Sequence, residues 1–514
     1  MKRLIVCCDG TWNSPEQETN GIPAPTNVFK IYNAVAEPDD GIKQLKYYHP
    51  GLGSEGGIFE SVVDGALGKS IGRHIKSAYH WLGQNFEKDD EIYLFGFSRG
   101  AFTARSIGGL LGRGLLDLRG LDPKEAWLRV DKAYAAYQRP GSKLTNRKWC
   151  KDNWTFFHGK RRTPVRFVGV WETVGALGVP DDLELLNLLD NRKKWEFHNT
   201  SLGTHMKTAR HAMAIDEIRS SFSITRWANA KGHPDVREKW FPGVHTDVGG
   251  GYPESDLSDG ALKWIIEESE AVGLEFRKGI ENELAPNPLG VSHDSYKGFF
   301  SKLRSRPRNI PAMGQGNEND FHDSAIERQR ASPISYPPYH PTKILAERDI
   351  HTVEVFADTR WNHTGLYLEK DHSYVFSAVG EWQDSKDTCD WKGTEDGKFT
   401  AGDLVRAGSS FLGKFEAPYK RLTGNNSTDF LMTKRVEKLK WFTLVGAITN
   451  DSDKKNAVEN DGSPTLHQYV ALAEHESVPL KITSPGYLYC FPNDVWSLYE
   501  NNHGSIHLTI TRVR

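Results

Sequence analysis

A serine between two glycines carries the clearest chemical signal in the chain. The apolar run Glu91 to Phe95 reads as a buried strand, Gly96-Phe97-Ser98-Arg99-Gly100 follows it, and Ala101 to Leu111 can form a helix. A strand, a sharp turn and a helix make a nucleophile elbow, in which the glycines permit the turn and the serine hydroxyl is exposed. We predict that Ser98 is a nucleophile and that the N–H of Arg99 faces the oxyanion of an ester reaction.

A second segment has the same G-x-S-x-G spacing, Gly68-Lys69-Ser70-Ile71-Gly72. No apolar strand precedes it, so the elbow context is missing. The segment also fails as a phosphate-binding loop, because Val63 stands where the first glycine of that motif belongs. Ser98 is therefore the favoured nucleophile.

A serine nucleophile needs a histidine that takes its proton and a carboxylate that orients the histidine. In α/β-hydrolases these follow in the order serine, acid, histidine at the ends of strands. The predicted strand Val165 to Trp171 leads directly into Glu172, and Trp240 to Val244 leads into His245 and a glycine-rich turn. We predict Glu172 as the acid and His245 as the base.

Other roles for these carboxylates stay open. Asp216 and Asp247 also lie in the right part of the chain to orient His245. Glu172 could instead form a structural ion pair with Arg210 or Arg219.

The first predicted strand, Leu4 to Cys8, ends in a tight loop, Asp9-Gly10-Thr11-Trp12-Asn13. The backbone N–H of Gly10 or Thr11 could complete the oxyanion hole. The alternative is that Asp9 only caps the turn.

The pattern of apolar residues predicts a mostly parallel α/β sheet followed by a β-sandwich. Short apolar runs alternate with helical stretches such as Gly72 to Glu87 in the first two thirds of the chain, and period-two segments follow a proline-rich stretch near residue 340. We predict an α/β-hydrolase-like domain at residues 1–340 and a β-sandwich at 341–514. The polar stretch 275–340 is either a lid or linker, or a solvated surface insertion.

Five motifs together resemble the α/β-hydrolase family that includes phospholipase effectors of bacterial type VI secretion. They are Cys8 to Asn13, Gly96 to Ala101, Gly169 to Gly175, Asp216 to Arg219 and Trp240 to Tyr252. The resemblance covers roughly residues 1–330 and implies a serine triad that hydrolyses acyl esters, often those of membrane phospholipids. It also implies peripheral membrane contact, export by a secretion machine and an immunity protein as partner. The chain departs from the family pattern at Glu172, where that pattern usually has Asp.

Residues with side-chain oxygens gather close to the C-terminus. They suit calcium, which binds carboxylate, amide and carbonyl oxygens. The alternative is an ordinary turn, because turns are rich in the same residue types. This part resembles the calcium-dependent galactose lectins of the PA-IL type over roughly 350–514. The motifs are Gly380-Glu381-Trp382 with Trp391, Val445 to Ile448, Asn493 to Val495 and Asn501 to Ser505. The resemblance implies a galactoside ligand and calcium held by Asp494, Asn501 and Asn502 and by the carbonyls of Leu498 and Ser385. The triad itself needs no cofactor.

Composition excludes several classes of protein. The 514 residues carry 65 Lys and Arg against 67 Asp and Glu, so no overall basic field indicates nucleic-acid binding. No apolar run is long enough to span a bilayer. The apolar run after Lys2 and Arg3 is cut short by Asp9, so we expect no signal peptide and synthesis in the cytoplasm. Five Cys without ligand-like spacing indicate neither a disulfide framework nor a zinc site.

The sequence as a whole predicts a serine esterase that acts on phospholipid, as an effector exported to a target cell. The alternative from another class is a carbohydrate-binding or secretion-adaptor protein whose hydrolase-like domain is inactive. A third hypothesis keeps the enzyme but replaces the lipid with a peptide, a sugar ester or a small soluble ester.

Overall fold

The computed structural model describes most of both halves of the chain. The described residues are 1–10, 13, 18–19, 21–37, 41–51, 66–139, 150–151, 153–159, 161–175, 201–298, 300–302, 304–331, 339–384, 387–394, 434–436, 438–450, 462–496 and 498–514.

A six-stranded sheet forms the centre of the N-terminal half, in the order β4-β1-β5-β6-β7-β8, with every neighbouring pair parallel. Its strands are β1 (Arg3–Cys8), β4 (Gln44–His49), β5 (Glu91–Phe97), β6 (Val165–Trp171), β7 (Met206–Ala214) and β8 (Val236–Phe241). All of β1 is buried, as expected of a parallel strand covered on both faces. The predicted α/β class is confirmed.

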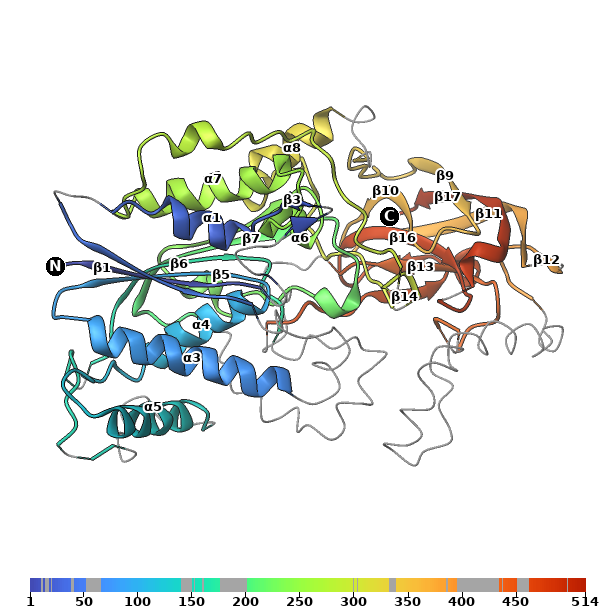
Figure 1. Cartoon of the computed structure of the whole chain (residues 1–514). Helices are drawn as coiled ribbons and strands as arrows, with labels where there is room; N and C mark the ends of the chain where they lie inside the picture. The colour runs from blue at the N-terminus through green and yellow to red at the C-terminus, as the bar shows by residue number, and fades with distance from the viewer. Residues whose placement is uncertain are drawn as a thin grey trace.

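Helices cover both faces of this sheet, and each face has its own apolar core (Figure 1). On one face lie α3 (Ala66–Asn85), α4 (Arg99–Leu111) and α5 (Pro123–Tyr137), and on the other α1 (Asn27–Ala34) and α7 (Asp256–Glu270). The short helix α6 (His245–Gly249) follows β8. A small hairpin joins β2 (Glu18–Thr19) to β3 (Ile22–Pro23).

Two antiparallel sheets make up the C-terminal half, one ordered β10-β16-β13-β14 and the other β12-β11-β17-β9, with β15 paired to β11. One apolar core contains buried residues of both sheets, so they form the predicted sandwich. The strands are β9 (Ile350–Phe356), β10 (Asn362–Leu368), β11 (Ser373–Asp384), β12 (Asp387–Cys389), β13 (Leu444–Ile448), β14 (Gln468–Ala471), β15 (Leu480–Lys481), β16 (Gly486–Pro492) and β17 (Asn502–Arg512).

The later part of the stretch between the two halves is packed against the rest of the chain. It contains α8 (Asp323–Arg330), and Phe321 and Arg328 within it are fully buried. An apolar cluster joins this stretch to both halves, because it contains Trp240 of β8 and Tyr487 of β16. The expected solvated insertion is therefore wrong for the part around residues 310–328, which apolar side chains anchor, whereas most of residues 281–298 are exposed. The domain boundary near 340 and the lid or linker role remain predictions.

Short 3-10 helices complete the described chain, at Ser220–Phe222, Ala230–Gly232, Ile280–Glu283, Phe300–Lys302, Glu318–Asp320, Leu472–His475 and Tyr499–Asn501.

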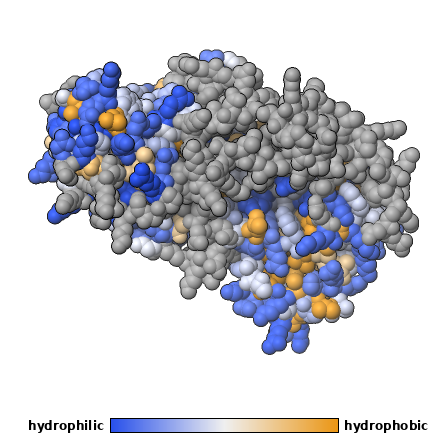
Figure 2. Space-filling view, turned by 90° about the horizontal axis from the view of Figure 1, so that it is seen from below, coloured by the Kyte–Doolittle hydropathy of each residue, from blue (hydrophilic) through white to orange (hydrophobic). Residues whose placement is uncertain are grey.

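The coloured residues on the face shown in Figure 2 are mostly polar. Among the described residues, no helix has the length and apolarity that crossing a membrane would require. Figure 2 shows more apolar atoms on the C-terminal half, at the lower right, than on the N-terminal half at the left. Exposed apolar side chains of the C-terminal half include Ile350 and Phe356 on the outer strand β9 and Val379 on β11 of the five-stranded sheet.

The carboxyl ends of the parallel strands point toward the C-terminal sheets (Figure 1). Backbone and side-chain hydrogen bonds tie this edge to the second half. Arg226 N–H donates to Gly462 O at 2.9 Å, and Asn309 Nδ2 donates to Thr465 O at 2.9 Å. Functional side chains at this edge therefore lie near the junction of the two halves.

Candidate active site

Ser98 occupies a strained turn between β5 and α4. Its backbone has φ +57° and ψ −124°, a region that non-glycine residues rarely adopt, and the residue is 5% exposed. A Cβ at Gly96 would lie 2.4 Å from Gly100 O, and one at Gly100 would lie 2.1 Å from Cys8 O. The turn therefore requires glycine at both positions, as a nucleophile elbow does.

The backbone of Ser98 is fixed beside the end of β6. Its N–H donates to Trp171 O at 3.0 Å, and its carbonyl accepts from the N–H of Val174 at 3.4 Å. These bonds hold Ser98 next to the turn that carries Glu172. Ser70, the serine of the second G-x-S-x-G, lies instead inside α3 and accepts a hydrogen bond from Arg73 at 3.1 Å.

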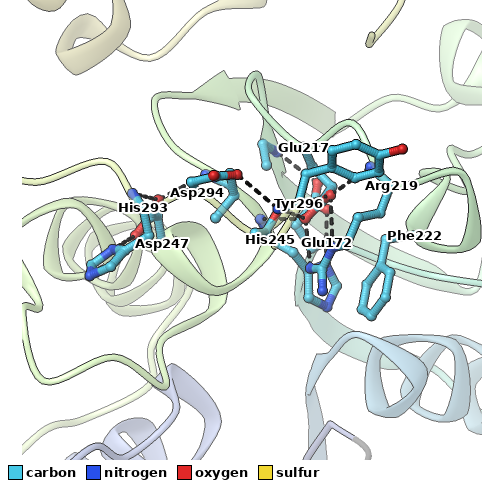
Figure 3. Close-up of polar contacts among 12 residues, drawn as sticks. Glu172, Glu217, Arg219, Phe222, His245, Asp247, His293, Asp294 and Tyr296 are labelled. Atoms are coloured by element: carbon cyan, nitrogen blue, oxygen red, sulfur yellow. Dashed lines mark hydrogen bonds and ion pairs between the residues drawn. The ribbon is translucent and has the colours of Figure 1, made fainter. Parts of the chain in front are cut away.

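Glu172 and His245 are in direct contact, as Figure 3 shows. Nδ1 of His245 lies 3.0 Å from Glu172 Oε2, and both residues are buried. The imidazole packs between Phe97, 4.7 Å away between ring centroids, and Phe222, 4.9 Å away. With Nδ1 engaged by the carboxylate, the Nε2 atom is the ring nitrogen left to exchange a proton with a substrate or nucleophile.

Glu172 is also held by its backbone and by a second hydrogen bond. Its φ is +43°, and its Oε1 accepts from the N–H of Ala214 at 2.7 Å. The structure therefore orients both carboxylate oxygens before any substrate binds.

Arg308 is the residue of this site that sequence reasoning missed. Its Nη2 donates to Glu172 Oε2 at 2.7 Å, and its Nε donates to Glu217 O at 3.1 Å. It lies 136 positions from Glu172 in a stretch rich in Arg and Pro, where no spacing distinguishes it from its neighbours. Only the packing of residues 304–331 against the sheet edge brings it to the site.

Burial and charge act in opposite directions on this pair. Burial alone would raise the pKa of Glu172, but the charge of Arg308 and the hydrogen bond with His245 hold this pKa below its ordinary value. Burial lowers the pKa of His245, against the raising effect of Glu172. The imidazole is thus neutral near pH 7, the form that can accept a proton.

Glu217 supports the histidine from the other side. Its Oε2 accepts from the backbone N–H of His245 at 3.3 Å, and both of its oxygens accept from Ser295 Oγ. Burial would raise its pKa, but Arg219, with further contributions from His245 and Arg308, lowers it to about 2. Glu217 is therefore an anion that positions the start of α6.

The rival acids lie elsewhere. Asp216 Oδ2 accepts from Tyr339 at 2.6 Å and from the N–H of Gly243 at 2.7 Å. Asp247 Oδ1 lies 2.6 Å from Nδ1 of His293, a different histidine. The alternative ion pairs of Glu172 are also wrong, because Arg210 pairs with Asp235 and Glu268 and Arg219 pairs with Glu217.

The loop after β1 lies against the elbow. A Cβ at Gly10 would sit 3.3 Å from Ser98 Cβ. The N–H of Gly10 donates to Asp9 Oδ1 at 2.7 Å, so the prediction that this N–H helps form the oxyanion hole does not fit the geometry. Thr11, the other candidate, lies outside the described residues. Arg99 is the first residue of α4, as predicted.

Asp9 organises this loop as a buried acid. Besides Gly10, it accepts hydrogen bonds from Thr26 Oγ1 at 2.7 Å and from the Tyr48 hydroxyl at 2.6 Å. Burial raises its pKa to about 6 despite these hydrogen bonds. The capping role predicted as the alternative for Asp9 agrees with these contacts.

Comparison with known proteins places this arrangement in a family. The model of the family described as "T6SS, Phospholipase effector Tle1-like, catalytic domain" matches residues 2–268, just over half of the chain. The chain belongs to this Tle1-like family. The resemblance drawn from the five sequence motifs is confirmed, and all residues of the Glu172–His245 pair and the elbow lie within the matched region, whereas Arg308 lies outside it.

Individual relatives match this chain over different shares of its length. An uncharacterized protein of Saccharomyces cerevisiae is 31% identical over 452 residues, a match covering 62% of this chain and 64% of the yeast protein. The chain thus spans just under two thirds of that relative. A solved structure, the Tle1 effector bound to the VgrG spike from the type 6 secretion system, is 14% identical with a TM-score of 0.28, covering 99% of this chain and 68% of that one.

The C-terminal half also has a match among solved structures. The N-terminal domain of EclA, a PllA-like lectin, is 14% identical with a TM-score of 0.16, over 32% of this chain and 95% of that one. A TM-score of this size does not establish a shared fold, so the lectin assignment stays a prediction.

The predicted calcium ligands lie around the end of β16. Asp494 and Asn502 are buried and adjoin, with Asn502 Nδ2 donating to Asp494 Oδ2 at 2.9 Å. Leu498 O accepts from the N–H of Asn501 at 3.3 Å, and the side chain of Asn501 is exposed. Ser385 lies outside the described residues. Within the described part of the chain, no three His, Cys, Asp or Glu side chains cluster as a metal site.

Replacing Arg308 tests the electrostatics of the site. We expect Arg308→Met to raise the pKa of Glu172 and to destabilise the fold by roughly 3–5 kcal/mol, because a buried carboxylate loses its charge partner. The lowered pKa of Glu172 stabilises the fold above the ordinary carboxyl range, and this stability is lost as the pH falls through the folded-state pKa. In the variant this pH-dependent stabilisation is smaller, so the difference in stability from wild type is largest near pH 8 and shrinks as the pH falls. Urea unfolding between pH 4 and 8 measures it.

Arg308→Lys is the matched control, since it keeps the positive charge and should stay close to wild type in its pH dependence. Equal stability curves for Arg308→Met and wild type would contradict this description of the site.

Proposed function

We propose that this chain is a serine esterase that hydrolyses acyl esters of phospholipids. The observation that carries the proposal is the buried hydrogen bond between Glu172 and His245 at the sheet edge where the Ser98 elbow also lies. The chain belongs to a family whose description names phospholipase effectors, and this supports lipid as the substrate class.

The reaction follows from the roles of these groups. Ser98 Oγ attacks the acyl carbonyl and gives its proton to Nε2 of His245, while Glu172 stabilises the imidazolium that forms. The N–H of Arg99 donates to the oxyanion. The tetrahedral intermediate then collapses, and the alcohol portion of the lipid leaves with the proton from His245. Water, deprotonated by the same histidine, cleaves the acyl-enzyme to the fatty acid and restores Ser98.

The substrate class can be tested by comparing fatty-acid release from phospholipid micelles with hydrolysis of a soluble short-chain ester. We expect faster turnover per enzyme on micellar lipid. Turnover of the soluble ester alone would favour the small-ester hypothesis. No turnover of either by the folded protein would favour the alternative, a binding or adaptor protein with an inactive hydrolase-like domain.

We also propose export and delivery as the setting of this activity. The solved Tle1 effector is bound to a VgrG spike, which supports a secretion machine as partner of this chain. Because hydrolysis of membrane phospholipids would harm the producing cell, that cell would then need an immunity protein.

A second candidate function belongs to the C-terminal half, where we propose a calcium site that serves galactoside binding. Asp494 and Asn502 are each 1% exposed, and Oδ1 of Asn502 is a buried acceptor without a hydrogen-bond partner among the described residues. A carboxylate beside an unsatisfied amide oxygen suits calcium, which prefers such oxygens. These two side chains would hold the ion.

Removing calcium tests this site separately from catalysis. We expect a chelator to lower the melting temperature of the wild type by several degrees, because a ligand at 100 times its dissociation constant stabilises the fold by about 2.7 kcal/mol. Asp494→Asn should melt lower and lose the response to the chelator. Identical melting with and without calcium in the wild type would contradict the site.

A further inference from the structure

A partly open cavity lies beside the active site, at the junction of the two halves. Its volume is about 20 Å³, and Pro464 of the C-terminal half forms part of its wall. Its polar lining consists mainly of Glu217, Arg219, Arg226, Arg306, Arg308 and Asn309. Three of its four arginines pair with carboxylates, Arg219 with Glu217, Arg226 with Glu238 and Arg308 with Glu172.

One of these arginines has an unused hydrogen-bond donor. Arg308 is 6% exposed, and its Nη1 has no partner among the described residues, although its Nε and Nη2 are both bonded. A buried guanidinium nitrogen without an acceptor is costly, which points to a ligand that supplies one.

The carboxylate in the lining does not compete for this donor. Glu217 is engaged by Arg219 at 2.7 Å, by Ser295 and by the N–H of His245. In Figure 3 the Arg219 side chain reaches Glu217 from one side, next to Glu172. The negative charge of Glu217 is therefore already balanced.

The local potential is positive on the C-terminal side as well. Burial lowers the pKa of His467 to about 3, and the charges of Arg306 and Arg435 act in the same direction. His467 also contacts Asn309, whose Oδ1 lies 3.0 Å from its Nε2. The charges of Arg306 and Arg435 therefore add to the effect of burial at His467.

We propose that this cavity binds a phosphate or phosphodiester oxyanion, with Arg306 and Arg308 as its principal ligands. Guanidinium groups form paired, charge-assisted hydrogen bonds with phosphate oxygens, and a tetrahedral anion can accept from several arginines at once. The anion could be the head group of a lipid or free phosphate. The lipid source rests on the proposed function, whereas the site itself does not.

Titration calorimetry of the full chain in chloride-free buffer tests the site without any turnover. One arm uses inorganic phosphate and the other uses glycerophosphoglycerol, a lipid head group that has no acyl ester. We expect saturable binding with a dissociation constant on the order of 1 mM or tighter. Arg306→Gln should weaken binding by roughly tenfold or more, because it removes a charged donor. The exposed Arg348 supplies the matched control, Arg348→Gln, which should bind like wild type.

The two arms separate the sources. Tighter binding of the phosphodiester supports a lipid head group, and tighter binding of inorganic phosphate supports a free anion. If Arg306→Gln does not fold, Arg306→Lys replaces it and should bind several-fold more weakly, since it loses the planar fork. No binding in either arm, or equal affinity of the Arg306 variant and wild type, would overturn the proposal. Loss of esterase activity has no bearing on this result, because neither probe is an acyl ester.

Discussion

Ser98→Ala is expected to lower acyl-ester hydrolysis by roughly 10⁴-fold or more while the fold is retained, because the attacking oxygen is removed and only weak binding effects remain. The change deletes one hydroxyl at a 5% exposed position and keeps a small residue in the strained turn. The measurement is the initial rate of fatty-acid release from phospholipid micelles, with circular dichroism as the check on folding.

The chain supplies its own matched control for this variant. Ser70 sits in the second G-x-S-x-G, within α3, so Ser70→Ala removes the same hydroxyl from the same local motif. Its rate should stay within about twofold of wild type, as for most surface substitutions. A Ser98→Ala protein that hydrolyses lipid at the wild-type rate would remove Ser98 from the mechanism.

Glu172→Gln is expected to reduce hydrolysis by about 10⁴-fold with little change in substrate affinity. Three donors converge on this carboxylate, namely the N–H of Ala214, Nη2 of Arg308 and Nδ1 of His245. An amide offers one oxygen and one NH₂ group, so at least one donor would face another donor. The imidazole would lose both its orientation and the charge that stabilises its protonated form.

Comparison with Glu172→Asp separates the effect of the negative charge on the rate from the effect of side-chain length. Aspartate keeps the charge and restores the residue usual in the family pattern, but its side chain is shorter by one methylene. We expect a loss of roughly 10²-fold, typical of a displacement near 1 Å. Full activity of Glu172→Gln together with an inactive Asp247→Asn or Asp216→Asn would instead place the acid on one of those residues.

Much of the fold and part of the site could be predicted from local sequence. Strands β1, β5 and β6 are continuous apolar runs with polar or glycine-rich ends, and the elbow has glycines where the backbone leaves no room for a side chain. Glu172 directly follows the largely buried strand β6, and His245 begins α6 soon after β8, so both lie where the strands end. Because parallel strands end at the same edge of the sheet, the two residues that follow these strands could be expected to lie close together.

Other features depend on contacts that no local pattern encodes. Strand β10 contains Asn, His, Thr and Gly, so its apolar alternation is broken although it pairs with β16. Arg308 acquires its role only when residues far apart in the chain pack at the sheet edge. Gly10 was expected to donate to an oxyanion, but the neighbouring carboxylate of Asp9 takes its N–H, a competition that sequence spacing does not reveal.

Active-site labelling shows directly whether Ser98 is the nucleophile. The wild-type protein would be incubated with a fluorophosphonate, which phosphonylates activated serines, and the modified peptide would be located by mass spectrometry. The account predicts a single adduct on Ser98 that is absent from Ser98→Ala and strongly reduced in Glu172→Gln. An adduct on another residue, or no adduct on protein that hydrolyses phospholipid, would contradict it.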